Sequence, residues 1–282
     1  MSLSIEARLK LAVEQLTEAG SESPHIDAAV LLCHVLDKPR SYLLTWPEKM
    51  LEEAQLTAFD AVMARRLTGE PVAYIVGERE FWSLPLKVAP HTLIPRPDTE
   101  RLVELALDKI PAGACSVLDL GTGTGAIALA IASERRDVSV TGIDLRPEAA
   151  ALATENGTNL HLGNARFLSG SWYSPLQTEA RFAVIVSNPP YIDEADPHLS
   201  QGDVRFEPKS ALVADDNGLA DIRIISEQGR QHLQAGGWLL MEHGFEQGEA
   251  VRTILLELGY HQVTTAQDYA GLDRVTLGCW QG

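Results

Sequence analysis

Apolar residues recur at helical spacing through the first 70 residues of the chain. Side chains three and four residues apart lie on one face of a helix, so each such stripe predicts an amphipathic helix. The first stripe comprises Ile5, Leu9, Ala12 and Leu16. The second follows Ser23 and Pro24, which suit an N-cap and a first helical position, and comprises Ile26, Ala29, Val30, Cys33 and Leu36. A longer pattern opens at Pro47 and ends at Gly69 and Pro71, so we expect a small helical bundle.

Two short alternating runs follow the helical region. Glu78–Trp82 and Leu84–Val88 are separated by Ser83 alone, which predicts a β-hairpin. Prolines at positions 90, 95 and 97 then make a stiff connector. Pro97 begins a helix whose first turn is acidic, as the positive end of a helix dipole favours.

From Ser116 onward, short runs rich in Val, Ile and Leu alternate with helical segments. This alternation predicts a mostly parallel sheet covered by helices on both faces, a doubly wound α/β fold. The expected parallel strands are Ser116–Leu120, Val138–Asp144, Ala165–Leu168, Phe182–Ser187 and Trp238–His243. Gln262–Ala266 and Arg274–Cys279 are expected to add an antiparallel edge pair, and Gly236-Gly237 to form a turn ahead of a strand.

Composition and charge narrow the class of protein. With 282 residues, 45% of them hydrophobic and 22% charged, the chain has a globular composition and enough length for two domains. No apolar run approaches the roughly 20 residues that span a bilayer, and the N-terminus lacks the apolar segment of a secretory signal. The net charge of −16 disfavours nucleic-acid binding, which draws on Lys and Arg to neutralise phosphates.

The potential metal ligands form no recognisable site. Cys33, Cys115 and Cys279 are widely separated without a CxxC pair, and the eight histidines show no ligand spacing. This pattern is typical of a reduced, cytoplasmic protein, so we expect neither a disulfide framework nor a metal.

A glycine-rich turn carries the clearest cofactor signal. Asp119-Leu120-Gly121-Thr122-Gly123-Thr124-Gly125 leaves one predicted strand and enters the apolar helix Ala126–Ala132. Glycines let the backbone turn sharply and lie close to a ligand. The spacing differs from the dinucleotide fingerprint G-x-G-x-x-G, and no Lys-Ser/Thr pair follows for a phosphate. The turn therefore favours a nucleoside ligand without phosphates, such as S-adenosylmethionine.

Asp144 supports this interpretation. It ends the next predicted strand, about 20 residues beyond the last glycine, where an acidic side chain can accept hydrogen bonds from the ribose hydroxyls.

Ser187-Asn188-Pro189-Pro190-Tyr191 follows the fourth predicted strand, at the sheet edge where α/β proteins bind ligands. The two prolines make the loop rigid, and the Asn oxygen with a proline carbonyl can accept both hydrogens of a planar NH2 group. The Tyr ring offers an aromatic face to that group. Holding both hydrogens aims a weakly nucleophilic nitrogen at a sulfonium methyl. The motif indicates an NH2 substrate without saying whose.

Four segments together resemble the peptide chain release factor glutamine methyltransferases of the HemK/PrmC type. They are Leu93-Ile94-Pro95-Arg96-Pro97-Asp98-Thr99-Glu100, DLGTGTGAIAL, SNPPYI and Gly202-Asp203-Val204-Arg205-Phe206-Glu207-Pro208. The resemblance extends over essentially the whole chain. It implies a seven-stranded class I methyltransferase domain, S-adenosyl-L-methionine as donor with S-adenosyl-L-homocysteine as product, and N5-methylation of the glutamine in the GGQ motif of release factors 1 and 2.

Residue roles follow from the same resemblance. The implied cofactor-binding residues are Gly121, Thr122, Gly123, Thr124, Gly125, Asp144, Trp172 and Asn188. Asn188, Pro189, Pro190 and Tyr191 are implied to bind the glutamine amide, and Asn188, Pro189 and Tyr191 to form the catalytic set. Ser171 stands where the family commonly has an acidic residue before the tryptophan.

Three alternatives are compatible with parts of the pattern. A related glutamine methyltransferase acts on a large-subunit ribosomal protein, although a different continuation from Pro97-Asp98-Thr99-Glu100 is expected there. DNA adenine N6-methyltransferases also use NPPY, but the net charge and the lack of an evident target-recognition domain count against them. A cofactor-binding scaffold would not need the motif.

The expected organisation is a two-domain cytoplasmic enzyme of translation termination. Residues 1–75 are expected to form a helical substrate-recognition domain, residues 76–97 a hairpin and proline-rich linker, and residues 98–282 the methyltransferase domain. Catalysis would depend on positioning, without a covalent intermediate.

Overall fold

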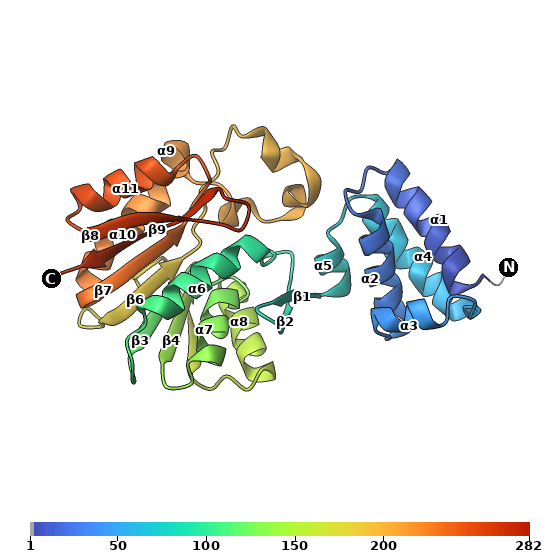
Figure 1. Cartoon of the computed structure of the whole chain (residues 1–282), viewed down its shortest axis with the longest axis horizontal. Coiled ribbons are helices and arrows are strands. Elements are labelled where there is room, and N and C mark those ends of the chain that lie inside the picture. The colour runs from blue at the N-terminus through green and yellow to red at the C-terminus, as the bar shows by residue number, and fades with distance from the viewer. Residues whose placement is uncertain (1–2) are drawn as a thin grey trace. The chain divides into compact units, whose positions relative to one another are not determined.

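The computed structural model describes residues 3–282, which divide into two compact units (Figure 1). One unit is helical and comprises the described residues up to Glu78 together with Ser200–Phe206. The other comprises Arg79–Leu199 and Glu207–Gly282 and contains the large sheet. No helix of the described residues is long and apolar enough to cross a membrane.

The helical unit encloses its own apolar core. Its helices are α1 (Ile5–Glu18), α2 (Pro24–Leu36), α3 (Arg40–Thr45), α4 (Glu53–Leu67) and α5 (Val72–Val76). Ser4 caps α1, because its hydroxyl accepts a hydrogen bond from the Ala7 amide. Leu16, Leu31 and Phe59, from three different helices, are buried against one another in this core. The expected bundle is present.

Two details of that expectation are wrong. The second helix buries Ala28, Leu31 and Leu32, whereas Ile26 and Val30 are 54% and 39% exposed. The helix is apolar around most of its circumference, so residue spacing did not select the buried face and packing against α1 and α4 did. The third pattern does not begin a long helix at Pro47 either, because α3 precedes it and α4 starts only at Glu53.

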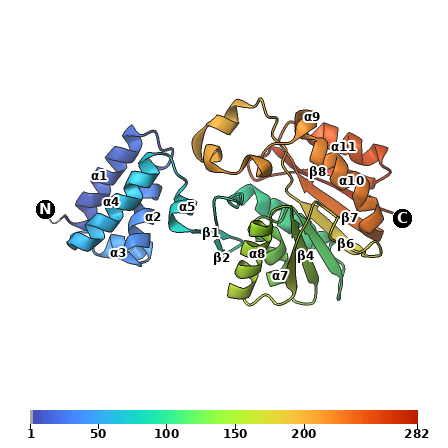
Figure 2. The same cartoon turned by 180° about the vertical axis from the view of Figure 1, so that it is seen from behind.

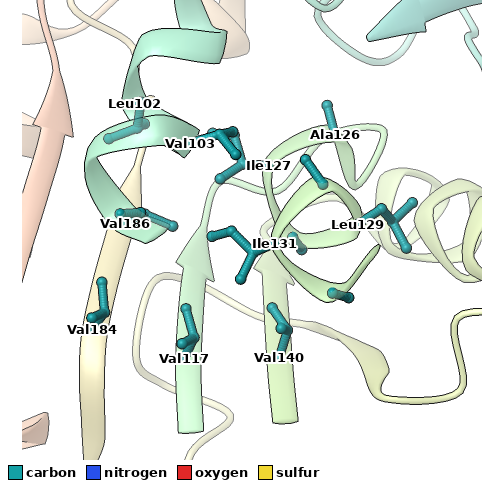
Figure 3. Packing of buried hydrophobic residues seen from close by; sticks show 14 of the residues in the cluster. Leu102, Val103, Val117, Ala126, Ile127, Leu129, Ile131, Val140, Val184 and Val186 are labelled. Carbon is teal, nitrogen blue, oxygen red and sulfur yellow. The ribbon is translucent and has the colours of Figure 1, made fainter. Parts of the chain in front are cut away.

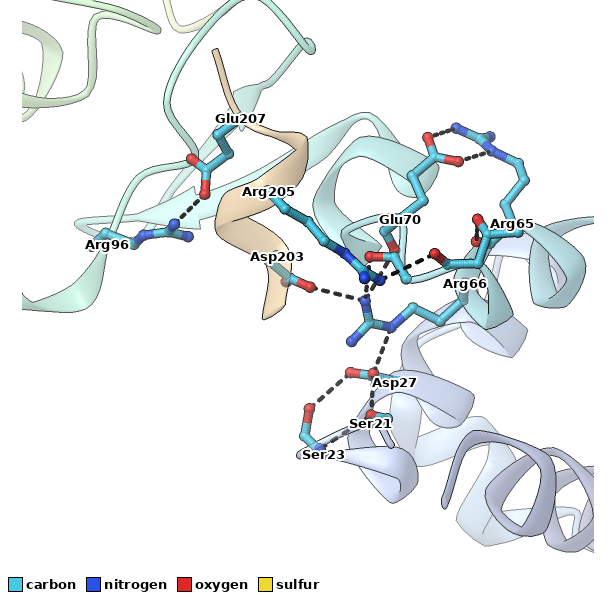
Figure 4. Close-up of polar contacts among 12 residues, drawn as sticks. Ser21, Ser23, Asp27, Arg65, Arg66, Glu70, Arg96, Asp203, Arg205 and Glu207 are labelled. Carbon is cyan, nitrogen blue, oxygen red and sulfur yellow. Dashed lines mark hydrogen bonds and ion pairs between the residues drawn. The ribbon is translucent and has the colours of Figure 1, made fainter. Parts of the chain in front are cut away.

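A buried arginine ties the insertion Ser200–Phe206 to the helices (Figure 4). The Arg66 guanidinium donates through Nε to Asp27 at 2.8 Å and through Nη1 to Asp203 at 2.9 Å. Nη1 also donates to the carbonyls of Gly69 and Glu70. Because only 11% of the Arg66 side chain is exposed, these acceptors replace most of the water that its charge would otherwise bind.

The seven-stranded sheet confirms the expected α/β fold. Its strands are β3 (Ser116–Leu120), β4 (Ser139–Asp144), β5 (Ala165–Ser169), β6 (Phe182–Ser187), β7 (Leu233–Glu242), β8 (His261–Gln267) and β9 (Asp273–Trp280). The order is β5-β4-β3-β6-β7-β9-β8. Strands β3 to β7 pair in parallel, and β9 pairs antiparallel with both β7 and β8.

Helices cover both faces of this sheet, as its continuous apolar strands require. They are α6 (Glu100–Lys109), α7 (Ala126–Glu134), α8 (Pro147–Asn159), α9 (Asp215–Gly218), α10 (Ala220–His232) and α11 (Gly248–Glu257). Short 3-10 turns occur elsewhere in the chain, at Pro97–Thr99, Pro197–Ser200, Gly202–Phe206 and Lys209–Ala211. Val117 packs with α6 and α7 on one face (Figure 3), and the next residue, Leu118, packs with α10 and α11 on the other. The two views of Figures 1 and 2 place α8 beside α7.

The hairpin and the fifth parallel strand differ in detail from expectation. Strands β1 (Glu78–Phe81) and β2 (Leu84–Lys87) are joined by Trp82 and Ser83, whose positive φ angles of 54° and 57° suit a two-residue type I′ turn. Gly236-Gly237 is not a turn ahead of a strand. It lies within β7, where Gly236 has φ +79° and the register against β6 shifts.

Candidate active site

A cavity of about 830 Å³ opens at the carboxyl ends of β3, β4 and β6. The chain leaves β3 toward β4 and β5 and later returns to add β6 and β7 on the other side, so β3 and β6 flank the switch point of the sheet. From the sequence-predicted set, the cavity is lined by Gly121, Thr122, Gly123, Thr124, Asp144, Trp172, Asn188 and Pro190. The sheet therefore gathers three separate motifs around one space.

The three glycines of the turn have different surroundings. All have positive φ angles, 70° at Gly121, 54° at Gly123 and 84° at Gly125. A Cβ at Gly123 would meet nothing within 4 Å, so its backbone is open on that side. Gly125 does not line the cavity, and a Cβ there would lie 3.0 to 3.2 Å from side chains of Leu129, Ala153 and Phe167. Gly125 therefore permits close packing at the start of α7.

Asp119 holds the turn from beneath. Its Oδ2 accepts hydrogen bonds from the Thr122 hydroxyl at 2.6 Å and the Ala128 amide at 3.2 Å. Its Oδ1 is buried and has no hydrogen-bond partner among the described residues. Burial raises the pKa of this carboxyl to about 7, because desolvation disfavours its charged form. Asp119 does not line the cavity, so its role is structural.

Asp144 presents a carboxylate whose direction is set by the backbone. One oxygen accepts from the Gly123 amide at 2.8 Å and the other from the Arg146 amide at 3.0 Å. An ionised carboxylate can accept about four hydrogen bonds, so both oxygens keep capacity for a ligand. The glycine turn and the end of β4 are thereby joined at the cavity wall.

A chain of hydrogen bonds sets the orientation of Asn188. Its amide nitrogen donates to the Thr99 hydroxyl at 3.3 Å, and Thr99 lies close enough to the buried Glu242 carboxyl to favour its charged form. The Tyr191 hydroxyl donates to the same carboxyl at 3.3 Å. Since the NH2 group of Asn188 is directed at Thr99, its Oδ1 points to the other side as an acceptor.

Burial dominates the electrostatics of Glu242. It raises the pKa of the carboxyl to about 7, against the lowering effect of Thr99, Arg274 and Tyr191. Burial and the neighbouring Glu242 charge raise the pKa of the Tyr191 phenol far above neutrality, so its hydroxyl stays a donor.

The rest of the NPPY loop packs against the fold. Pro189 is buried and Tyr191 is mostly buried, and neither lines the cavity. The Tyr191 carbonyl accepts from Gln247 Nε2 at 3.0 Å, and a Cβ at Gly218 would lie 2.0 Å from that carbonyl oxygen. Only glycine fits at that position, so Gly218 and Gln247 hold the loop from its far side.

Several contributors carried no signal in sequence reasoning. Thr99, Glu242, Gly218 and Asn156 are brought to the site by tertiary folding. Thr99 lay within the IPRPDTE segment used for the resemblance, so that segment could have directed attention to it. The other three are isolated polar or glycine residues without a spacing pattern.

Two regions of the chain match models of known protein families. Residues 8–77 match the family model described as the PrmC N-terminal domain, and residues 99–206 match the methyltransferase small domain. A solved methyltransferase structure from Pyrococcus furiosus superposes with a TM-score of 0.54 at 20% identity, covering 79% of this chain and 99% of that chain. This likeness supports the fold.

Curated relatives extend over the full chain. A release factor glutamine methyltransferase from Vibrio cholerae is 69% identical over 278 residues, which is 99% of this chain and 97% of that protein. One from Escherichia coli is 54% identical over 270 residues, covering 96% of each. The protein is therefore an enzyme, and the chain belongs to the release factor glutamine methyltransferase family.

Proposed function

We propose that this enzyme transfers a methyl group from S-adenosyl-L-methionine to the side-chain amide nitrogen, N5, of the glutamine in the GGQ motif of release factors 1 and 2. The observation that carries the proposal is the placement of Asn188. It lines the same cavity as the glycine turn and Asp144, with its amide nitrogen engaged by Thr99 and its oxygen directed elsewhere. The Asn188 side chain thus borders a cavity that is large enough for a nucleoside.

The cavity residues fit S-adenosylmethionine. The backbone at Gly123 is open, and the Asp144 carboxylate keeps acceptor capacity for two ribose hydroxyls. The cavity volume of about 830 Å³ is within the range usual for small-molecule sites. The cofactor residues are then Gly121 to Gly125, Asp144, Trp172 and Asn188, with Gly125 acting through packing. The bound cofactor supplies the electrophilic methyl group.

The substrate nitrogen needs orientation more than deprotonation before the transfer. Its lone pair is delocalised into the carbonyl, so positioning of the NH2 group by acceptors supplies much of the catalysis. Asn188 Oδ1 is one acceptor, and the Pro189 carbonyl is the second acceptor in this proposal. Pro190 lines the cavity beside Asn188, while Tyr191 keeps the loop in place through Glu242.

The protein substrate requires recognition beyond one side chain. In this proposal residues 1–75 recognise the release factor, residues 76–97 are a linker and residues 98–282 carry out the transfer. The exposed Ile26 and Val30, one turn apart on α2, offer apolar contact area for such a partner. The relatives from V. cholerae and E. coli carry release factors in their names, which favours this substrate over DNA. The proposed location is the cytoplasm.

The experiment supplies labelled S-adenosylmethionine with one acceptor at a time. The acceptors are release factor 1, release factor 2, a release factor whose GGQ glutamine is alanine, a large-subunit ribosomal protein extract and duplex DNA. Label on both natural release factors, located at the glutamine by fragmentation mass spectrometry, is the expected result. Label on the alanine variant, or a preference for ribosomal protein or DNA, would contradict the proposal.

A further inference from the structure

The connector between the hairpin and α6 contributes side chains to the cavity that have no assigned role. Leu93, Pro95 and Arg96 line it, together with Asn188 and Pro190 of the NPPY loop. Arg96 is the one side chain of these five that carries a charge. Because arginine stays protonated at any working pH, the connector adds a permanent N–H donor to the cavity wall.

One short turn relates Arg96 to the NPPY loop. The Arg96 carbonyl accepts a hydrogen bond from the Thr99 amide at 3.2 Å, which closes the 3-10 turn Pro97–Thr99. The Thr99 hydroxyl accepts from Asn188 Nδ2 at 3.3 Å. Arg96 and Asn188 are therefore held relative to each other by this turn.

A buried carboxylate holds the Arg96 guanidinium in place (Figure 4). Glu207 Oε1 accepts from Arg96 Nη2, and Glu207 Oε2 accepts from the Ile94 amide at 2.9 Å. The Glu207 side chain is fully buried, whereas 34% of the Arg96 side chain is exposed. A guanidinium has five N–H donors, so Arg96 can donate to a ligand in the cavity while it keeps this ion pair. Since the pair as a whole is neutral, it attracts an anion less than a lone arginine would.

We propose that Arg96 donates a hydrogen bond to the carbonyl oxygen of the substrate's side-chain amide. This inference rests on the proposed function, in which Asn188 Oδ1 and the Pro189 carbonyl accept from the NH2 end of the same amide. The amide is then recognised at both ends, by acceptors at its nitrogen and by a donor at its oxygen. A glutamate side chain would place a negative charge against the two acceptors, and the neutral Arg96–Glu207 pair does not compensate for that repulsion. Arg96 and Glu207 therefore select glutamine over glutamate.

This hydrogen bond should act on substrate binding more than on the transfer step. The amide nitrogen uses its lone pair to attack the methyl group, so its conjugation with the carbonyl weakens and the oxygen loses negative charge. A donor to that oxygen therefore stabilises the bound substrate at least as much as the transition state, and its loss should appear in KM. Loss of the Asn188 acceptor, by contrast, should appear in kcat.

The first test is steady-state methylation of intact release factor 1 by full-length variants. In Arg96→Ala, KM for the release factor should rise about 10- to 100-fold, the range for a hydrogen bond from a charged group, while kcat changes little. Because this substitution leaves Glu207 buried without its cation, the double variant with Glu207→Gln is measured beside it. The new amide can still accept from Ile94, and the double variant should show the same rise in KM.

The second test measures inhibition by a release factor in which the GGQ glutamine is replaced by glutamate. Wild type should bind this inhibitor weakly. Glu207→Gln alone leaves the Arg96 charge unneutralised, so inhibition should become about tenfold stronger, as expected for a charge-assisted contact. The double variant lacks that charge and should again bind the inhibitor weakly. A purely structural role for Arg96 would not produce this reversal.

Arg101→Ala is the matched control. Its side chain is 32% exposed and pairs with Glu104 at 2.8 Å, but it lies outside the cavity, so KM should stay at the wild-type value. An unchanged KM in both Arg96 variants would overturn the proposal. So would a loss of affinity for S-adenosyl-L-homocysteine as large as the rise in KM, or equal inhibition of Glu207→Gln and wild type by the glutamate form. Failure of wild type to methylate release factor would instead contradict the proposed function.

Discussion

At the scale of single residues, the direction of one side-chain amide decides what the site can bind. An Asn side chain has a donor end and an acceptor end of nearly equal size, so its neighbours must choose between two orientations. Here Thr99 makes the choice, because its hydroxyl accepts a hydrogen bond from the Asn188 NH2 group at 3.3 Å. In the proposed mechanism, the acceptor end binds the substrate amide.

Loss of the Asn188 acceptor should therefore lower the rate of transfer more than cofactor affinity. Asn188→Ala is expected to reduce kcat by about 10²- to 10³-fold, the cost of removing one positioned polar contact. Thr99→Val keeps the shape of Thr99 but removes its hydroxyl, so a smaller loss of kcat is expected from free rotation of the amide. Single-turnover rates with saturating cofactor and release factor measure both.

The control for these variants is their affinity for the product S-adenosyl-L-homocysteine, measured by calorimetry. It should change far less than the rate, although Asn188 lines the cofactor cavity and some loss is expected. If Asn188→Ala transfers the methyl group at the wild-type single-turnover rate, the orientation of this amide does not contribute to catalysis.

Buried carboxyls at this scale also make stability depend on pH. The pKa of Asp119 is about 7 in the folded protein against 3.8 for the free side chain, so the folded state holds a proton that the unfolded state has released. Stability must then fall as pH rises from about 4 to about 7 and level off above that. Glu242, also at about 7, acts in the same direction.

Asp119→Asn should flatten this dependence. An amide can still accept from Thr122 and Ala128 but cannot ionise, so the variant should lose about 1 kcal/mol less per pH unit than wild type between pH 5.5 and 7. Urea unfolding at several pH values measures the slope. Glu242→Gln should reduce the pH dependence of stability by a similar amount. If stability falls with pH as steeply in both variants as in wild type, neither carboxyl is protonated in the folded state.

At the scale of elements, one buried side chain joins three parts of the cavity's support. Asn156 on α8 accepts from the Lys87 amide at 2.8 Å and donates to the Lys87 carbonyl at 3.0 Å. It also donates to the Thr124 carbonyl at 2.9 Å. The hairpin strand β2, the glycine turn and α8 are therefore held together by an amide that is 1% exposed.

Asn156→Ala should destabilise the enzyme by about 2–5 kcal/mol. The substitution leaves the Thr124 carbonyl buried without a partner and the amide and carbonyl of Lys87 part-buried without one. Each loss costs on the order of 1–3 kcal/mol, and water recovers some of it at Lys87. The free energy of unfolding in urea measures the loss. Thr158→Ala, on the exposed side near the end of the same helix, is the control and should cost much less. Equal losses in the two variants would contradict the joining role.

At the scale of the whole molecule, the division of the chain does not follow sequence order alone. Ser200–Phe206 lies between β6 and α10 in the chain but belongs to the helical unit, where Asp203 binds Arg66 and the Arg205 side chain donates to the Thr68 carbonyl. The polypeptide that leaves the NPPY loop therefore passes through the helical unit before it returns to the sheet. Removal of the helices takes away the partners of this insertion.

A chain beginning at Phe81 should bind S-adenosyl-L-homocysteine but methylate intact release factor poorly. The cavity lies wholly within the second unit, so product binding should persist. The proposed recognition area is lost, and each 1.4 kcal/mol of lost contact energy should raise KM about tenfold. In this shortened chain, limited proteolysis should cut within Ser200–Phe206, because the insertion has lost its helical partners. An unchanged kcat/KM on intact release factor would contradict the recognition role.

Full-length variants separate recognition from folding. Ile26→Asp with Val30→Asp alters two exposed side chains of α2 and should raise KM with little change in stability. Leu256→Asp, also exposed but on α11, is the control and should leave KM unchanged.

Local sequence patterns were sufficient to predict much of the fold and the location of the candidate site. The alternation of short apolar runs with helical segments predicted the α/β sheet, because buried parallel strands must be apolar on both faces. The glycine turn, Asp144 and the NPPY loop could be placed at one sheet edge, since the carboxyl ends of parallel strands meet there. These inferences depend on neighbours in sequence, which is why they succeeded.

Tertiary packing decided what sequence spacing could not. The buried face of α2 depended on which helices pack against it, and the bulge that keeps Gly236 within β7 depended on pairing with β6. The orientation of Asn188 toward Thr99 joins residues from segments far apart in the chain. A buried hydrogen bond leaves no periodicity in sequence, because its strength comes from the exclusion of water that only the folded chain provides.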